Sequence, residues 1–238
     1  MKKFLFILFF TTSFVIGQNQ ANTWYFGENA GLDFNGGDPV HLLNGALDTN
    51  EGCASISNSN GEILFYTDGI TVYNRNHVVM ANGDGLNGDP SSTNSAIIVP
   101  KPDSTTLYYV FTVDKRAEED GLQYSEVDIS LDSGLGAVTS LKNVLLQTPT
   151  AEKITSVRKE DNSGYWVVSH KWNSDEFITY DVTNTGVNPI PIISAVGTFI
   201  NGQTTQTIGA IKISPDGTRL AVARGEGLSE VQLFDFDS

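Results

Sequence analysis

The stretch Ile211–Ala223, which reads IKISPDGTRLAVA, is the clearest single indication of the fold. Two short apolar runs flank Asp216-Gly217, which is a turn dipeptide, so the stretch predicts a β-hairpin. Similar turns occur three more times, and each is followed by a short apolar strand without helical periodicity. These three turns are Asn60-Gly61, Pro102-Asp103-Ser104 and Asn162-Ser163-Gly164, and the strands that follow the four turns are Ile63–Thr67, Leu107–Val113, Tyr165–His170 and Arg219–Ala223. The chain is therefore predicted to be all-β.

The spacing of these turns indicates an internal repeat. They lie roughly 40 to 60 residues apart, near the spacing of repeats that fold as four-stranded blades, with loop insertions in the longer intervals. We therefore expect residues 22–238 to form a β-propeller domain of four-stranded antiparallel blades, of which about four are present. The fourth blade lacks an outer strand, which predicts a truncated ring with an uncovered edge. The hairpin Trp24–Phe34 is expected either to supply strands that close this ring or to cap the N-terminal end.

The first residues of the chain have the pattern of an export signal. Lys2 and Lys3 precede the mostly apolar stretch Phe4–Gly17, and Val15 and Gly17 occupy the small-residue positions of a cleavage site. The apolar stretch is too short to span a bilayer comfortably. Residues 1–17 are therefore predicted to be a secretory signal peptide, the alternative being an uncleaved anchor. The mature chain is expected to be secreted or held at the outer cell surface, without membrane insertion.

Charge and cysteine content narrow the classes of partner and chemistry. The formal net charge is −14 at pH 7, and this disfavours nucleic acids and anionic membranes because both are negatively charged. Cationic partners and calcium stay open. Cys53 is the single cysteine, so no intrachain disulfide can form. We interpret Cys53 as a small buried hydrophobic residue rather than a nucleophile.

Six strings between residues 24 and 100 carry a family resemblance. They are WYFG at 24–27, GLDF at 31–34, EGCASIS at 51–57, LFYTDG at 64–69, VYN at 72–74 and GDPSSTNSAIIVP at 88–100. Together they resemble the N-terminal propeller of large secreted proteins from the Bacteroidetes that are labelled gliding-motility-associated. Members of that family often continue into PKD-like immunoglobulin modules and a type B sorting domain for type IX secretion, and this sequence contains neither. The resemblance implies delivery to the cell surface and supplies no catalytic residues.

A second resemblance concerns the fold alone. The string ISPDGTRLA at 213–221 is similar to the blade hairpin that TolB-like and WD-like propellers share. Because a propeller is a scaffold for many functions, this likeness implies nothing about activity.

A weak metal hypothesis rests on the stretch Asn82–Asp89. Its carboxylate and amide oxygens are hard ligands of the kind calcium prefers, with Asp84 and Asp89 as candidate ligands. The stretch lacks the residue order of an EF-hand, and the same residue types are those that turns require. His41, His77 and His170 lie far apart in sequence, so no transition-metal site is predicted. No cofactor is predicted, and calcium stays open as the alternative.

A catalytic hypothesis rests on acidic residues. Glu51, Asp68 and Glu126 could project toward the centre of a propeller, where a glycosidase needs a protonated acid and an ionised partner at a defined separation. Glu51 and Asp68 are the candidate catalytic pair, although the sequence specifies neither their protonation nor their separation. A sialidase-type Asp-box, a nucleophile elbow and a P-loop are not found in the sequence.

These observations favour a non-catalytic function. We expect a rigid scaffold that presents loops to a protein or glycan partner in adhesion or surface assembly. Trp24 and Tyr25 are the aromatic residues expected to be exposed. An extracellular hydrolase of the glycosidase type and a calcium-stabilised structural spacer are the alternatives.

Overall fold

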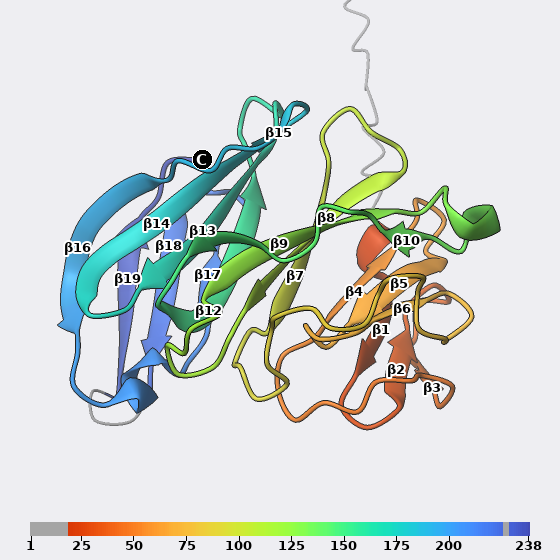
Figure 1. Ribbon diagram of the computed structural model, residues 1–238, viewed down its shortest axis with the longest axis horizontal. Coiled ribbons are helices and arrows are strands. Elements are labelled where there is room, and N and C mark those ends of the chain that lie inside the picture. The colour runs from red at the N-terminus through yellow and green to blue at the C-terminus, as the bar shows by residue number, and fades with distance from the viewer. Residues whose placement is uncertain (1–18, 226–228) are drawn as a thin grey trace, which may run out of the picture.

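The computed structural model describes residues 19–225 and 229–238. The predicted signal peptide, residues 1–17, lies outside the described residues. The described chain consists mainly of short β-strands with three 3-10 turns, which confirms the all-β class. The strands form five antiparallel sheets that follow one another in chain order, from the N-terminal sheet at the right of Figure 1 to the C-terminal sheet at the left.

The five sheets contain three, three, five, five and three strands. The first contains β1 (Thr23–Phe26), β2 (Ala30–Asp33) and β3 (Val40–Leu42), and the second contains β4 (Ala54–Ser57), β5 (Ile63–Thr67) and β6 (Val72–Asn74). The third contains β7 (Ala96–Pro100), β8 (Leu107–Val113), β9 (Leu122–Asp128), β10 (Ala137–Val138) and β11 (Val144–Gln147). The fourth contains β12 (Thr150–Arg158), β13 (Tyr165–Lys171), β14 (Ser174–Thr183), β15 (Gly186–Val187) and β16 (Ile192–Ile200). The fifth contains β17 (Ile211–Ile213), β18 (Arg219–Arg224) and β19 (Glu230–Asp235), and the 3-10 turns are η1 (Asn19–Ala21), η2 (Asp132–Gly134) and η3 (Thr204–Thr207).

The predicted propeller of about four four-stranded blades is wrong. The described strands form five separate sheets, none of which is closed or propeller-like. The hairpin of β1 and β2 takes β3 as a third strand and becomes a sheet of its own, so it neither closes a ring nor completes another sheet. At the outer edges, β9 pairs with both β10 and β11, and β14 pairs with both β15 and β16. Turn signals locate hairpins, but they do not determine which strands share a sheet.

The predicted hairpins themselves are confirmed. β5 and β8 begin and end at the predicted residues, and β13 and β18 each extend one residue beyond the prediction. The turn between β17 and β18 shows the local cause. Gly217 has a φ of +69°, which a residue without a Cβ adopts readily, and the Asp216 carboxylate accepts the Thr218 N–H at 3.1 Å.

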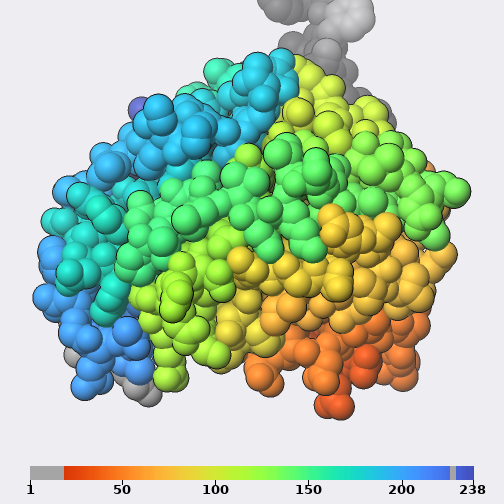
Figure 2. Space-filling view, viewed as in Figure 1, coloured from red at the N-terminus to blue at the C-terminus, as the bar shows by residue number. Residues whose placement is uncertain are grey.

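The hydrophobic core is divided among the interfaces between neighbouring sheets. Four clusters of buried side chains lie between successive sheets, and the largest contains Phe111 of the third sheet and Tyr180 of the fourth. A single sheet has an apolar face that must be buried against another element. Each sheet therefore depends on its neighbours, and Figure 2 shows the resulting continuous surface from one end of the stack to the other.

The stacking brings the first strands of successive sheets into contact. β1 contacts β4, β4 contacts β7, β7 contacts β12, and β12 contacts β17. Residues at corresponding positions of these strands, although far apart in sequence, therefore line one surface. Within the described part of the chain, no helix has the length and apolar character needed to cross a membrane.

The core arrangement predicts a large effect of truncating an aromatic residue between sheets. Phe111 is fully buried and Phe199 is 49% exposed, so the same change from Phe to Ala tests burial alone. Phe111→Ala is expected to lower the free energy of unfolding by about 3–5 kcal/mol because it leaves a cavity, whereas Phe199→Ala is expected to lower it by less than about 1 kcal/mol. Urea denaturation followed by circular dichroism measures both, and equal losses would contradict the proposed interface core.

Candidate functional site

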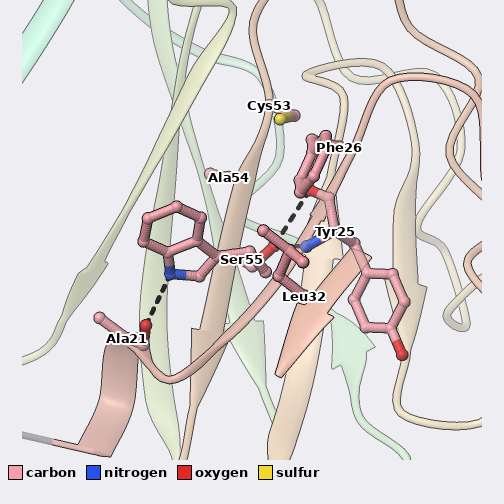
Figure 3. Close-up of a pocket in the computed structure, with 8 residues that line it drawn as sticks. Ala21, Tyr25, Phe26, Leu32, Cys53, Ala54 and Ser55 are labelled. Carbon is pink, nitrogen blue, oxygen red and sulfur yellow. Dashed lines mark hydrogen bonds between the residues drawn. The ribbon is translucent and has the colours of Figure 1, made fainter. Parts of the chain in front are cut away.

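Three adjoining cavities share lining residues and form one concave feature. The first, of about 480 Å³, lies against β1 and β4, and Trp24 is among its lining residues; Figure 3 shows the residues around it. The second, of about 540 Å³, shares Ala21 and Ser55 with the first. The third, of about 190 Å³, shares Pro100, Arg158 and Tyr165 with the second. We refer to the three cavities together as the Trp24 groove.

Trp24 is held at one end of the groove by strand alternation. Successive side chains of β1 point to opposite faces, so Trp24 is 48% exposed while Tyr25 is only 3% exposed. The indole N–H of Trp24 donates to the Ala21 carbonyl at 2.6 Å, and its ring lies 4.9 Å from that of Phe34. These contacts fix the ring while leaving much of its surface open. The expected exposure is confirmed for Trp24 and wrong for Tyr25, which stacks on Tyr66 at 4.5 Å in the core.

The walls around Trp24 present mostly carbon. Phe26 and Leu32 come from the first sheet, and Cys53 and Ala54 come from the second (Figure 3). The Ser55 hydroxyl donates to the Tyr25 carbonyl at 3.3 Å and accepts the Tyr25 N–H at 2.9 Å, and the Tyr25 hydroxyl donates to the Asn44 side-chain oxygen at 3.1 Å. Burial raises the pKa of the Cys53 thiol, which keeps it protonated and weakly nucleophilic, in line with a packing role. This end of the groove therefore suits an apolar face of a ligand.

The second cavity has a different chemistry because it gathers residues from four sheets and η1. Besides Ser55, four polar side chains line it, and these four make no hydrogen bond or ion pair with another described residue. They are Gln20 of η1, Ser156 and Arg158 of β12, and Tyr165 of β13. Ile56, Pro100, Val157 and Pro215 complete the wall. The cavity thus combines apolar surface with polar groups whose hydrogen-bonding capacity is free.

The third cavity extends the groove along the hairpin turns. It adds Lys101, Asp103, Ser104 and Asn162 to the shared Arg158 and Tyr165. The Asp103 carboxylate is engaged, since it accepts a hydrogen bond from the Asn184 amide at 2.8 Å. From Trp24 to Lys101 the groove therefore changes from apolar to polar and basic.

The predicted catalytic carboxylates do not lie along this groove. The Asp68 carboxylate accepts the N–H groups of Ile70 at 2.9 Å and Thr71 at 2.7 Å, so it stabilises the turn after β5. The Glu126 carboxylate accepts the Thr139 hydroxyl at 3.2 Å. Glu51 is exposed and precedes β4. Desolvation and then the charge of Glu152 raise the pKa of Glu51.

Glu152 is an acidic residue that the sequence reasoning missed. It is 1% exposed, and its carboxylate accepts the Thr93 N–H at 3.3 Å, the Thr93 hydroxyl at 2.7 Å and the Arg116 N–H at 2.9 Å. The signal was available, because Glu152 and Lys153 are the charged residues in an otherwise uncharged run from Thr150 to Val157. Glu152, rather than Asp68, is therefore the carboxylate whose charge adds to the raised pKa of Glu51.

The two calcium candidates, Asp84 and Asp89, lie in different surroundings. Asp84 is exposed, and the Asp89 carboxylate forms an ion pair with Lys115 at 3.0 Å and accepts the Ser91 N–H at 2.8 Å. Residues 19–225 and 229–238 contain no group of three or more His, Cys, Asp or Glu side chains that could hold a metal ion.

The histidines also occupy separate environments. His41 is exposed, and His77 lies beside the Tyr66 hydroxyl and the Asn44 amide. His170 is buried against Phe177, and desolvation lowers its pKa to about 4. The three side chains therefore take part in different local structures.

A further acidic residue, Asp114, makes stability dependent on pH. It follows β8 and is 4% exposed, and burial raises the pKa of its carboxyl group to about 6 from an ordinary 3.8. A carboxyl group with a raised pKa binds its proton more tightly in the folded state. Its burial as a neutral group is favourable at low pH, and this contribution is lost as the pH rises from about 4 through 6.

Replacing Asp114 by Asn is expected to remove this dependence. Asp114→Asn should raise the free energy of unfolding by about 1–3 kcal/mol at pH 7.5 and leave it nearly unchanged at pH 4. Urea denaturation at the two pH values measures the difference, with Asp38→Asn at an exposed position before β3 as the control. A stabilisation of equal size at both pH values would show that ionisation of Asp114 is not the cause.

Comparison with known proteins leaves the chain without a family. No protein-family model and no curated protein matches it. Among solved structures, it is similar to a functionally unknown protein from Desulfotomaculum acetoxidans DSM 771, with 12% sequence identity and a TM-score of 0.44. The match covers 87% of this chain and 58% of that protein, so the chain spans less than two thirds of its length. A likeness at this level carries no argument about fold or function.

Proposed function

We propose that the chain is an exported, non-catalytic glycan-binding protein whose ligand lies along the Trp24 groove. The observation that carries the proposal is the combination of a half-exposed indole with four unengaged polar side chains in one continuous concavity. A sugar ring has an apolar face of C–H groups and a rim of hydroxyl groups. The indole of Trp24 matches the face, and Gln20, Ser156 and Tyr165 can exchange hydrogen bonds with the rim.

The shape of the site favours a glycan over a folded protein partner. Ligand sites are typically concave, with volumes of roughly 300–1,000 Å³ and a few well-placed polar groups. The two larger cavities, at about 480 and 540 Å³, fall within this range. A protein partner instead covers a broad patch of about 800 Å² on each side. An elongated ligand of several sugar residues would reach from Trp24 to Arg158.

Export and surface delivery belong to the same proposal. They are supported by the basic and apolar pattern of residues 1–17 and by the family resemblance of the strings between residues 24 and 100. A glycan-binding scaffold outside the cell would serve adhesion to polysaccharide or to a neighbouring surface.

Removing the indole tests the proposed site. Trp24→Ala is expected to weaken binding of oligosaccharides four to six residues long by about 10-fold, which corresponds to about 1.4 kcal/mol. Isothermal titration calorimetry with a panel of neutral and acidic oligosaccharides measures the change. Trp172→Ala is the matched control, because Trp172 lies outside the groove. The proposal fails if the unmodified protein binds no member of the panel. It also fails if both variants bind the oligosaccharides as tightly as the unmodified protein does.

An extracellular hydrolase is the second candidate, and the environment of Glu51 favours it. Glu51 is exposed with a raised pKa, as a general acid requires, and the Glu152 carboxylate that influences it is held by three hydrogen bonds. The non-catalytic proposal remains first because the open aromatic groove does not contain these two residues.

The hydrolase hypothesis has a direct test. If Glu51 is the acid, the protein should release reducing ends from the same oligosaccharides, and Glu51→Gln should lower the rate by about 100-fold or more. Glu62→Gln, on the exposed β4–β5 turn, should leave the rate unchanged. Absence of hydrolysis across the panel would eliminate this candidate while leaving the binding proposal intact.

A further inference from the structure

We infer that the Trp24 groove selects glycans that carry a carboxylate and that Arg158 receives this group. The inference rests on the proposed function, and it adds both the ligand class and the direction in which the ligand lies. It is based on the distribution of charge along the groove and on the free guanidinium group at one end.

Charge is distributed unequally between the two ends. The segment 19–74, which includes Trp24 and the first two sheets, contains no Lys or Arg. It contains seven carboxylates, which are Glu28, Asp33, Asp38, Asp48, Glu51, Glu62 and Asp68. The opposite end of the groove brings together Lys101 and Arg158. In a chain with a net charge of −14, this end is a local concentration of positive charge beside a cavity.

Arg158 is free to bind a ligand. Its side chain lines both the second and third cavities, and it makes no ion pair or hydrogen bond with any side chain in residues 19–225 and 229–238. The next residue, Lys159, shows the contrast. Its ammonium group pairs with Asp181 at 2.6 Å and lies 4.0 Å from the centroid of the Trp166 ring. The cation of Lys159 is thus used within the fold, whereas that of Arg158 faces the groove.

The groups around Arg158 suit a carboxylated sugar. A guanidinium group can donate two parallel hydrogen bonds to a carboxylate. Tyr165 lies beside Arg158 in both cavities, and its ring and hydroxyl offer a further apolar face and a hydrogen-bonding group. Asp103 is the one carboxylate lining the third cavity; its hydrogen bond from the neutral Asn184 amide leaves its charge in place, so the lining carries two cations and one anion. The acidic segment around Trp24 would repel a second carboxylate, so the acidic sugar lies at the Arg158 end and a neutral sugar at the Trp24 end.

The experiment uses the mature chain and pairs of ligands that differ only in charge. The probes are tetrasaccharides with one terminal uronic acid, and the neutral partners are their methyl esters. Isothermal titration calorimetry at low salt should show about 10-fold tighter binding of the acids, and raised ionic strength should reduce the difference. Arg158→Gln should abolish this preference and leave binding of the esters nearly unchanged.

The control and the outcomes separate the inference from the proposed function. Arg219→Gln removes an exposed arginine that pairs with Asp235 on the fifth sheet, and it should keep the preference for acids. If acids and esters bind equally, or if Arg158→Gln retains the preference, the inference is wrong while glycan binding stands. If neither form of any probe binds, the proposed function fails and the inference fails with it. Thermal unfolding of both variants shows whether they remain folded.

Discussion

The packing of each sheet against the next is the interaction on which the rest of the structure depends. The described sheets have only three to five short strands, and the four clusters of buried side chains lie between sheets rather than within one central core. Apolar burial stabilises by about 25 cal/mol per Å², and here nearly all of that burial belongs to interfaces. The fold is therefore held together by contacts between neighbouring sheets, and the middle sheets are covered on both faces.

The same packing creates the groove. Because the first strand of each sheet touches the first strand of the next, residues as distant in sequence as Gln20, Ile56, Arg158 and Pro215 line one cavity. No local segment contains this site. It exists only when the first, second, third, fourth and fifth sheets are stacked in order, and its polar groups come from strands that also carry core residues on their opposite faces.

The sequence predicted the local structure well and the assembly poorly. Turn dipeptides and apolar runs located β5, β8, β13 and β18 to within a residue, because backbone conformation at Gly217 and Asp216 is a local property. Pairing at the sheet edges is not local. The two-residue strand β10 beside β9, and the third strand beside β2, follow from packing that the turn signals do not contain, and this is why the expected blades were wrong.

In the candidate site, too, local features could be predicted from the sequence and the features that depend on sheet packing could not. Strand alternation places Trp24 and Tyr25 on opposite faces of β1, but which of the two is buried could not be assigned without knowing which face meets the next sheet. Asp68 was predicted as a reactive carboxylate and instead stabilises a turn, a role that short-range hydrogen bonds to Ile70 and Thr71 explain. No sequence motif marks Arg158 as a candidate binding residue, because only its position in the cavity indicates that role.

Because the walls of the groove come from η1 and all five sheets, a ligand lying in it would contact several interfaces at once. Binding to the folded state alone raises its stability in proportion to the logarithm of ligand concentration. In this fold the gain would be shared by neighbouring sheets, since separating any two of them would break the wall. A bound ligand would therefore hold neighbouring sheets together. Mechanical load on a bound glycan would then be distributed over several sheets rather than acting on one hairpin.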